Sequence, residues 1–433
     1  MGITRRNFIK GTLAAAALPA VVPCSVFGAE QKVPPSERIA LGFVGLGIHG
    51  VGMNLKSFLQ EQDAQVVAMC DVDAKHLQNA MKVAREHYAR RKEDFQCFTT
   101  GDWREVVART DVDAVVVSTP DHWHVLISVA AIEAGKDVIC EKPLSLTVRE
   151  GRVLSDAVRR HRRIFQTATE NRSKGNFLRV CELVRNGRIG ELHTIHTKLP
   201  RGPEARGSVK AWEPEPVPQH LDYDMWLGQA PEAPYTPARC HNSFRWNLDY
   251  SGGKLTDWGA HINDLAQWGN DTEYTGPVSV EGRGDFPHDG LFNTATDWEL
   301  HYKYANGVDL ICMSGGTSIR FEGTDGWVSV PAWNRAVEAS SPKILNSVIG
   351  PEELHLRTCK QREQRDFLNC VKSRQETYAP AEVGHRTITI SHIGNIAMLL
   401  GRKLKWNPEK ERFVGDEQAN SMLSRAMRSP WSL

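Results

Sequence analysis

Residues 39–50 read IALGFVGLGIHG, a continuous apolar run that leads directly into the pattern G-x-G-x-x-G. Such a run is typical of a strand buried on both faces of a parallel sheet. In this pattern Gly45 permits a tight turn, Gly47 lets the backbone approach a diphosphate, and Gly50 lets the following helix pack closely on the strand. The stretch therefore predicts a strand, a turn and a helix whose N-terminus binds a dinucleotide.

A second apolar run, over residues 66–70, ends at Asp71. An acid about twenty residues beyond such glycines accepts hydrogen bonds from the adenosine ribose hydroxyls. Its negative charge repels a 2'-phosphate, so the sequence favours NAD over NADP as the cofactor. Asp73 is interpreted as a helix cap rather than a ligand.

Two more apolar runs, over residues 114–117 and 138–140, resemble the first two. Between the runs, apolar residues recur at helical spacing over 77–88, and residues 122–134 can form another helix. Strands that alternate with helices predict an α/β fold with a doubly wound parallel sheet. We expect this Rossmann domain to cover residues 36–167.

The second part of the chain, residues 168–433, has a different pattern. Apolar and polar residues alternate over 298–304, Asn306-Gly307 supplies a turn, and a second hairpin follows over residues 319–330. Alternation with one polar face predicts a large open antiparallel sheet in a second α/β domain. The Pro- and Gly-rich stretch 201–237 is interpreted as a long surface excursion that forms an active-site wall or a subunit contact.

The N-terminus carries Thr-Arg-Arg-Asn-Phe-Ile-Lys at residues 4–10, followed by small apolar residues over 11–22. This pattern predicts a twin-arginine signal peptide over residues 1–29 and export to the periplasm. The apolar stretch is too short and too rich in alanine for stable membrane insertion. Because the twin-arginine route carries folded proteins, it suits an enzyme that acquires a cytoplasmic cofactor before export.

Composition excludes several classes of protein. The 53 Lys and Arg residues nearly balance 52 Asp and Glu residues, so no basic excess is available to bind nucleic acid. The nine cysteines form no C-x-x-C pair, and Cys70, Cys140 and Cys312 lie in apolar runs. We therefore expect buried thiols rather than disulfides or a zinc site.

Three polar clusters follow the predicted strands or open a predicted helix. Residues 118–124 read STPDHWH, Glu141-Lys142-Pro143 ends the next run, and residues 251–264 read SGGKLTDWGAHIND. The first two clusters stand where a doubly wound sheet binds its ligands, beyond the carboxyl ends of its strands. If the third cluster is helical, Asp257 and His261 are four residues apart and share a face.

With these motifs in this order, the chain from residue 38 onward resembles the Gfo/Idh/MocA family, the group of glucose-fructose oxidoreductase and inositol dehydrogenase. The resemblance implies a Rossmann domain, a second α/β domain whose open sheet serves oligomer contacts, and therefore a homo-oligomer. It implies oxidation or reduction of a hydroxyl on a sugar or cyclitol substrate. The family's catalytic lysine falls on Lys142, and its Asp and His fall on Asp257 and His261.

Hydride removal from a secondary alcohol also requires the hydroxyl proton to leave, so the site needs a base and a positive group beside the oxygen. We expect His261 to exchange the proton, Asp257 to orient it or to bind substrate, and Lys142 to polarise the reacting oxygen. The roles of Lys142 and His261 are interchangeable at this level. No third ligand is visible beside Asp257 and His261, so no metal is predicted.

Other candidate residues surround these three. We expect His124 to pack beneath the nicotinamide and Glu141 to hold the Lys142 loop. Substrate contacts are expected from two tryptophans and two arginines, because sugar faces stack on indoles and hydroxyls pair with guanidinium groups: Arg172, Trp226, Arg245 and Trp246. The expected cofactor-binding residues are Gly45, Gly47, Ile48, His49, Gly50, Asp71, Ser118, Thr119, Pro120, His124, Glu141 and Lys142.

Three functions remain open from the sequence. The first is an exported sugar or cyclitol dehydrogenase, or an enzyme that passes hydride between two sugars without releasing its cofactor. The second is an NAD-dependent glycosidase or lyase that oxidises the sugar transiently. The third is a non-catalytic sugar sensor, which the intact Lys142, Asp257 and His261 disfavour.

Overall fold

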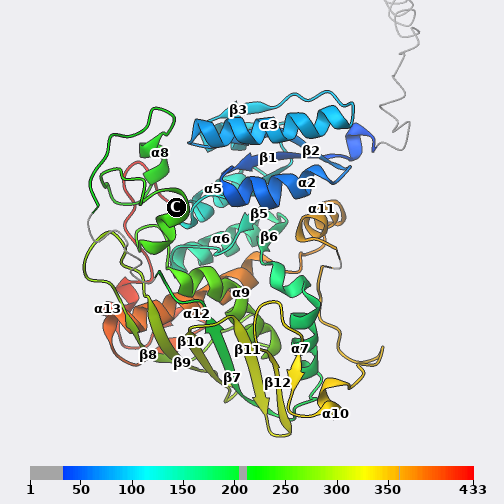
Figure 1. The fold of residues 1–433 in the computed structure, drawn as a ribbon, viewed down its shortest axis with the longest axis vertical. Helices are drawn as coiled ribbons and strands as arrows, with labels where there is room; N and C mark the ends of the chain where they lie inside the picture. Colours follow the sequence, from blue (N-terminus) through cyan, green and yellow to red (C-terminus); the bar gives the residue numbers. More distant parts are fainter. Residues whose placement is uncertain (1–32, 204–211, 360) are drawn as a thin grey trace, which may run out of the picture.

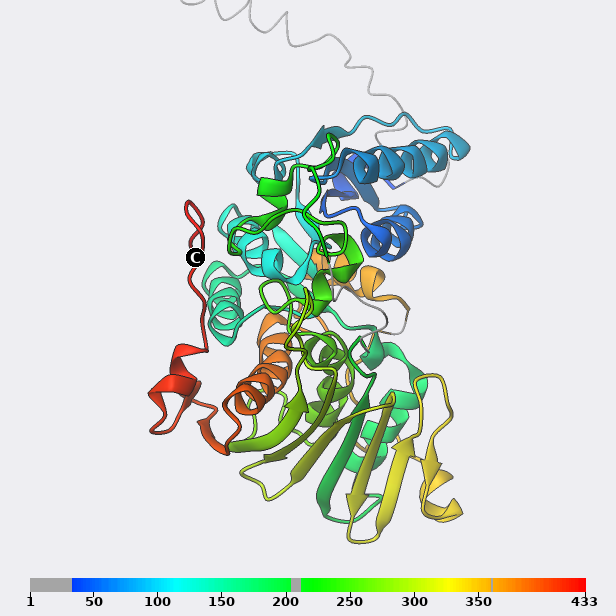
Figure 2. The same cartoon turned by 60° about the vertical axis from the view of Figure 1, so that its left-hand side comes forward.

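The computed structural model describes residues 33–203, 212–359 and 361–433. The signal peptide predicted over residues 1–29 lies outside them. Two sheets organise the chain: a parallel sheet in the first part and a larger, mixed sheet in the second (Figure 1). Figure 2 shows the two sheets at opposite ends of the molecule, with helices between them.

The first sheet has six parallel strands in the order β3-β2-β1-β4-β5-β6. This is the doubly wound arrangement that the alternating pattern predicts. The central strands are almost completely buried, as their apolar composition requires. The strands are β1 (Ile39–Val44), β2 (Ala64–Cys70), β3 (Phe98–Thr100), β4 (Ala114–Val117), β5 (Asp137–Glu141) and β6 (Phe165–Ala168).

Helices cover both faces of this sheet, and two of them begin at well-formed caps. Asp73 accepts a hydrogen bond from the Lys75 amide and caps α3, as predicted. At α6, Thr147 and Glu150 form a reciprocal capping box. The helices are α2 (Lys56–Leu59), α3 (Ala74–Arg90), α4 (Trp103–Ala108), α5 (Asp121–Glu133) and α6 (Val148–His161).

The helix after the glycine turn differs from the prediction in its first turns. Residues Gly50–Leu55 form a π-helical segment before α2 begins. A regular helix here would bury its apolar residues on one face; Leu55 and Phe58 are buried, but Met53 is 44% exposed. The wider π-helical turn shifts the phase of the apolar positions, so a pattern read with 3.6 residues per turn misplaces Met53.

The second sheet has nine strands in the order β13-β12-β11-β7-β10-β9-β8-β14-β15. Its neighbours are antiparallel, as predicted, except that β10 pairs in parallel with β7. The strands are β7 (Leu192–Leu199), β8 (Ser279–Asp285), β9 (Asp297–Lys303), β10 (Asp309–Ser314), β11 (Ser318–Gly323), β12 (Gly326–Val330), β13 (Glu338–Ala339), β14 (Leu404–Asn407) and β15 (Arg412–Phe413).

Helices α9 (Lys254–Gly269) and α12 (Ala381–Leu400) lie between this sheet and the first domain (Figure 1). Helix α7 (Gly175–Arg185) packs on α9 and on β12. Along β9, Trp298, Leu300 and Tyr302 are buried against the helices, whereas His301 and Lys303 are exposed on the other face. The remaining helices of this part are α8 (Tyr223–Leu227), α10 (Pro342–Leu345), α11 (Glu363–Ser373) and α13 (Glu417–Ser421).

Three segments of the second half return to the first domain. Residues 212–250, here called the cover segment, bond to the end of β2: the Asp222 amide donates to the Val72 carbonyl, and the Ala74 amide to the His220 carbonyl. Helix α11 packs Phe367 edge-on against Phe58 of α2. Near the C-terminus, Trp431 packs against tryptophans of α4 and α5.

The eight cysteines in the described ranges are all free, and seven of them are buried. The prediction of buried thiols is therefore confirmed for these residues. Within residues 33–203, 212–359 and 361–433, no helix combines the length and the apolar character needed to cross a bilayer.

Candidate active site

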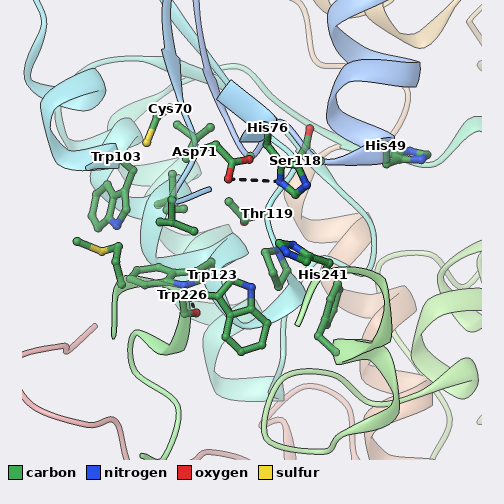
Figure 3. Close-up of a pocket in the computed structure, with 18 of the residues that line it drawn as sticks. His49, Cys70, Asp71, His76, Trp103, Ser118, Thr119, Trp123, Trp226 and His241 are labelled. Carbon is green, nitrogen blue, oxygen red and sulfur yellow. Dashed lines mark hydrogen bonds and ion pairs between the residues drawn. The ribbon is translucent and has the colours of Figure 1, made fainter. Parts of the chain in front are cut away.

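A cavity of about 460 Å³ opens at the carboxyl ends of β1, β2 and β4 (Figure 3). This volume lies within the range of small-molecule binding sites. Residues of the cover segment, among them Met225 and His241, form a second wall of the cavity beside the glycine turn. The predicted residues that line it are Gly45, Gly47, Ile48, His49, Asp71, Ser118, Thr119, Pro120, Trp226 and Arg245.

The three glycines fit a dinucleotide for different steric reasons. Gly45 has φ of +88°, and a Cβ atom there would lie 2.5 Å from the Ser118 carbonyl carbon. A Cβ at Gly50 would lie 2.2 Å from the Gly45 carbonyl oxygen, so helix and strand pack as closely as predicted. At Gly47 the nearest atom is His76 Cε1 at 4.0 Å, which leaves backbone open to the cavity for a diphosphate.

Asp71 stands at the end of β2, where the ribose acid was predicted. Its carboxylate accepts hydrogen bonds from the amides of Leu46, at 2.6 Å, and Asp73, at 2.8 Å. This carboxylate also raises the pKa of His76, whose Nδ1 lies 3.6 Å away. An apolar wall flanks this end of the cavity and suits an adenine ring: Trp103, Trp123, Ile127, Met225 and Trp226.

Lys142 directly follows β5 and Asp257 lies on α9, yet their side chains meet. Lys142 Nζ lies 2.6 Å from Asp257 Oδ1, and Lys254 Nζ lies 2.9 Å from Asp257 Oδ2. Arg245, which also lines the cavity, places Nε 3.9 Å from Asp257 Oδ1. Burial alone would raise the pKa of Asp257, but these three cations outweigh burial and hold the pKa far below its usual value.

His261 lies one turn beyond Asp257 on α9. Burial lowers the pKa of His261 well below its usual value, and the positive charge of Lys142 lowers it further. The ring is therefore a neutral imidazole. Its Nδ1 has no hydrogen-bond partner among the described residues, so Asp257 binds Lys142 and does not orient His261.

His124 is the first of two buried side chains that hold the loops around Lys142. Both ring nitrogens of His124 face carbonyl oxygens, those of Pro143 at 2.8 Å and Thr119 at 2.9 Å. Since carbonyls only accept, His124 donates twice and carries a charge. Burial opposes that charge, but Cys140, Asp121 and the Pro143 carbonyl raise the pKa of His124 to about 10.

Glu141 connects the lysine loop to the glycine turn. Its carboxylate accepts hydrogen bonds from Asn54, at 2.8 Å, and lies 3.0 Å from His49 Nε2. Asn54 also donates to Ser118 Oγ at 2.9 Å. Asn54 was not predicted from the sequence, because an asparagine inside a helix start carries no signal of its own. Of the predicted cofactor-binding residues, Gly50, His124, Glu141 and Lys142 do not line the cavity. His124 and Glu141 instead position the loops around it.

The four predicted substrate residues are placed differently from one another. Arg172 is 1% exposed, and its guanidinium donates to Asp264 and Glu273 beside the Trp268 ring. These hydrogen bonds hold the Arg172 guanidinium inside the second domain. The expectation that Arg172 lines the cleft is therefore corrected. Arg245 and Trp226 do line the cavity, and Trp246 lies under Lys254, whose Nζ is 5.1 Å from its ring.

Aromatic side chains that the sequence did not single out surround His261. Its ring lies 5.2 Å from Trp333 and 5.9 Å from Trp258. Lys174 Nζ lies 3.9 Å above the Trp333 ring. Trp333 follows β12, 72 residues beyond His261 in the chain, and only the tertiary fold brings them together.

A doubly wound sheet with this glycine turn, and a buried Lys–Asp pair beside a neutral histidine, define a dinucleotide-binding oxidoreductase. Residues 39–169 match the family model described as "Oxidoreductase family, NAD-binding Rossmann fold", and residues 206–433 match its "C-terminal alpha/beta domain". Residues 2–22 match the twin-arginine translocation signal sequence. The chain belongs to the Gfo/Idh/MocA family and is an NAD-binding oxidoreductase.

Solved structures share the fold at low sequence identity. An aldose-aldose oxidoreductase from Caulobacter crescentus, complexed with glycerol, gives a TM-score of 0.62 at 18% identity over 85% of this chain and 99% of that chain. The WlbA dehydrogenase from Bordetella pertussis, in complex with NADH and UDP-GlcNAcA, gives a TM-score of 0.64 at 16% identity over 86% of this chain and 99% of that chain.

Curated relatives are more similar in sequence over shorter stretches. A glycosyl hydrolase family 109 protein from Shewanella sp. (strain ANA-3) is 31% identical over 210 residues, 44% of each chain. An alpha-N-acetylgalactosaminidase from Shewanella oneidensis is 30% identical over 163 residues, 37% of this chain and 34% of that one. The chain therefore matches less than half the length of these relatives.

Proposed function

We propose that the protein transfers hydride between bound NAD and a secondary hydroxyl of a sugar or cyclitol. The observation that carries this proposal is the buried pair of Lys142 and Asp257, 2.6 Å apart, beside the neutral imidazole of His261. The arrangement supplies a fixed positive charge and a free base side by side. Alcohol oxidation needs both.

The chemistry divides between these residues. A bound NAD would supply the acceptor for the hydride of the substrate carbon. The ammonium of Lys142 donates a hydrogen bond to the substrate oxygen and stabilises the negative charge that develops there. A ring nitrogen of His261 takes the hydroxyl proton, and Asp257 holds Lys142 in place. In the reverse direction His261 returns the proton to the carbonyl oxygen.

The surroundings of His261 suit a sugar. Trp258 and Trp333 lie beside the His261 ring, and Trp246 lies under Lys254, which donates to Asp257. Sugars stack their apolar faces on such rings. The ammonium groups of Lys174 and Lys254 lie over two of these rings and offer donors to hydroxyls. We expect Arg245 to contact both cofactor and substrate, because it lines the cavity and lies near Asp257.

Asp71 supports NAD rather than NADP. Its carboxylate stands at the ribose end of the cavity, where a 2'-phosphate would meet a negative charge. The wall that the cover segment adds to the cavity further supports a cofactor that stays bound between turnovers. An exported enzyme in the periplasm would then recycle its own NAD by passing hydride from one sugar to another.

The exposed face of the nine-stranded sheet supports a homo-oligomer. On β9 this face carries His301 and Lys303, and on β11 Arg320 lies 4.2 Å from the Trp327 ring of β12. An indole with a stacked guanidinium is typical of interface centres. Light scattering on the purified protein tests this: a monomer at micromolar concentration would contradict it.

The curated relatives favour one alternative function. Two of them are named glycosyl hydrolase family 109 protein and alpha-N-acetylgalactosaminidase. In a redox-neutral cleavage, hydride leaves the sugar, the neighbouring C–H becomes acidic, elimination breaks the glycosidic bond, and the hydride returns. The same Lys142 and His261 would serve this reaction.

One experiment separates these functions. The purified protein is denatured and its nucleotide identified by mass spectrometry, while the folded protein is assayed with sugars and aryl glycosides for both NADH and released nitrophenol. Bound NAD with sugar-dependent reduction supports the proposal, and nitrophenol without net NADH supports the glycosidase. Equal activity in Lys142→Ala and in the exposed control Lys82→Ala would overturn both.

A further inference from the structure

A cluster of two histidines and a buried aspartate stands at the ribose end of the cavity, which both histidines line, and it includes none of the catalytic residues. Asp73 and His76 come from the start of α3, and His241 comes from the cover segment. One ligand atom from each of these three residues lies within 4.8 Å of the other two. Asp73 is 2% exposed. We propose that Asp73, His76 and His241 bind a divalent transition-metal ion of the zinc type.

The two oxygens of Asp73 are used differently. Oδ1 accepts hydrogen bonds from the Lys75 amide at 2.8 Å and from His220 Nδ1 at 3.1 Å. Oδ2 faces His241 Nε2 at 3.5 Å. The carboxylate is therefore oriented by one oxygen and presents the other to His241, as expected of a ligand held by hydrogen bonds from outside the site.

The separation between His241 and Asp73 matches metal coordination better than a hydrogen bond. A nitrogen donates to a carboxylate oxygen at about 2.7–2.9 Å, and 3.5 Å between His241 Nε2 and Asp73 Oδ2 is longer. Two ligands of a tetrahedral zinc ion, each about 2.0–2.1 Å from the metal, stand about 3.3–3.4 Å apart. The His76 and His241 rings lie 4.7 Å apart, so both flank the space beside Asp73.

Figure 3 shows the His76 and His241 rings near each other at the edge of the cavity, with the ion pair between Asp71 and His76 drawn. The two imidazoles and one carboxylate form the ligand set of many zinc sites with an open fourth position. Because Asp73 and His76 belong to the first domain and His241 to the cover segment, the ion would join the two.

The test uses the full-length protein after treatment with a chelator and dialysis. Co²⁺ and Zn²⁺ are added in separate titrations, with and without saturating NAD, and bound metal is counted by elemental analysis. We expect one tightly bound ion per chain, visible absorption bands typical of tetrahedral Co²⁺, and a higher melting temperature with Zn²⁺. A wild-type protein that binds no ion at equimolar metal would overturn the proposal.

Two variants remove ligands while keeping the local backbone. Asp73→Asn retains a side-chain oxygen to cap α3, and His241→Asn suits the left-handed conformation of this residue, whose φ is +53°. We expect at least a tenfold weaker affinity for Co²⁺ in each, and unchanged binding in the exposed control His355→Gln. Equal Co²⁺ affinity in all three variants would contradict the site.

A second readout separates metal ligation from contact with the nucleotide. If His76 and His241 only flank adenosine, these variants would change the amount of copurified nucleotide while the wild type binds no ion. That result would also overturn the proposal. The melting temperature of each variant in chelator, compared with wild type in chelator, shows whether the fold is retained.

Discussion

Lys142 Nζ and Asp257 Oδ1 are 2.6 Å apart, although 115 residues separate them in the chain. The side chain of Asp257 is also within 4 Å of Lys254 and Arg245. A single carboxylate therefore organises three cations, one of which, Arg245, lines the dinucleotide cavity. The geometry of the whole reacting site depends on this one negative charge.

Asp257→Asn is expected to lower kcat by about 10²–10³-fold, because Lys142 loses the partner that fixes it beside the substrate oxygen. Removing one member of a buried pair also leaves uncompensated charge, so the melting temperature should fall. Steady-state kinetics with the best sugar substrate measures the first effect. The exposed control Asp285→Asn should leave kcat unchanged, and an equal kcat in both variants would contradict the role of Asp257.

The pH dependence of sugar oxidation should reflect the low pKa of His261. An ordinary histidine protonates near pH 6.5, but this ring stays neutral as pH falls through that value, so kcat/KM should hold down to about pH 6 or below. The unfolded chain binds the proton in that window and the folded chain does not, so stability should decrease as pH falls below 6.5. A decline in kcat/KM centred at pH 6.5 would exclude His261 as the base.

Gly50→Ala is expected to abolish tight nucleotide binding, because the new Cβ would lie 2.2 Å from the Gly45 carbonyl oxygen and displace the turn. Gly52→Ala is the matched control: no atom lies within 4 Å of its Cβ, and alanine favours helix by up to about 1 kcal/mol. Nucleotide content per chain, measured after denaturation, checks both variants. Loss of nucleotide from both, or from neither, would be inconsistent with this account.

Arg428→Ala should speed release of the bound nucleotide without changing the chemical step. Arg428 donates to the Gly228 carbonyl at 2.9 Å and to Asp224 at 2.6 Å, and so ties the C-terminal tail to the cover segment. Nucleotide retention during dialysis measures the effect. Arg402→Ala, which breaks a surface pair with Asp416, is the control and should retain nucleotide like wild type.

Asp63→Asn should lower the free energy of unfolding by about 1 kcal/mol at pH 7 after allowance for solvent screening. Burial would raise the pKa of Asp63, but Arg365 and Lys372 lower it to about 2. A lowered pKa stabilises the fold above about pH 3.8, and this contribution is lost as pH falls toward 2.

Thermal unfolding of Asp63→Asn and wild type should therefore differ at pH 7 and converge near pH 2–3. The surface control Glu86→Gln should match wild type at both values, since its partner Arg90 is 77% exposed. A constant difference at all pH values would mean that the carboxylate charge is not what stabilises the contact with α11.

The first domain was predictable because its signals are local. The apolar runs over 39–44 and 114–117 coincide with β1 and β4, and the glycines identify the turn by sterics alone. The parallel pairing of β7 with β10 was not predicted, because these strands are more than 100 residues apart and each pattern describes only its own strand.

Within the site, the sequence identified candidate groups for the chemistry but not their partners. Asp257 was expected to orient His261 or to bind substrate, and the sequence did not indicate that it binds Lys142. Arginine is a residue type that binds sugar hydroxyls, and only the fold shows that the Arg172 guanidinium is already paired with Asp264 and Glu273. Trp333 lies beside His261 through tertiary packing, which no spacing in the sequence encodes.

The return of α11 to the first domain limits how this protein can be recombined. A chimera that joined residues 39–168 to the second half of a different family member would leave Phe58 without Phe367 and Asp63 without Arg365 and Lys372. The two halves of the chain therefore cannot be exchanged between family members at the boundary between the two sheets. A domain swap that works would have to carry α11 together with α2 and Asp63, which it contacts.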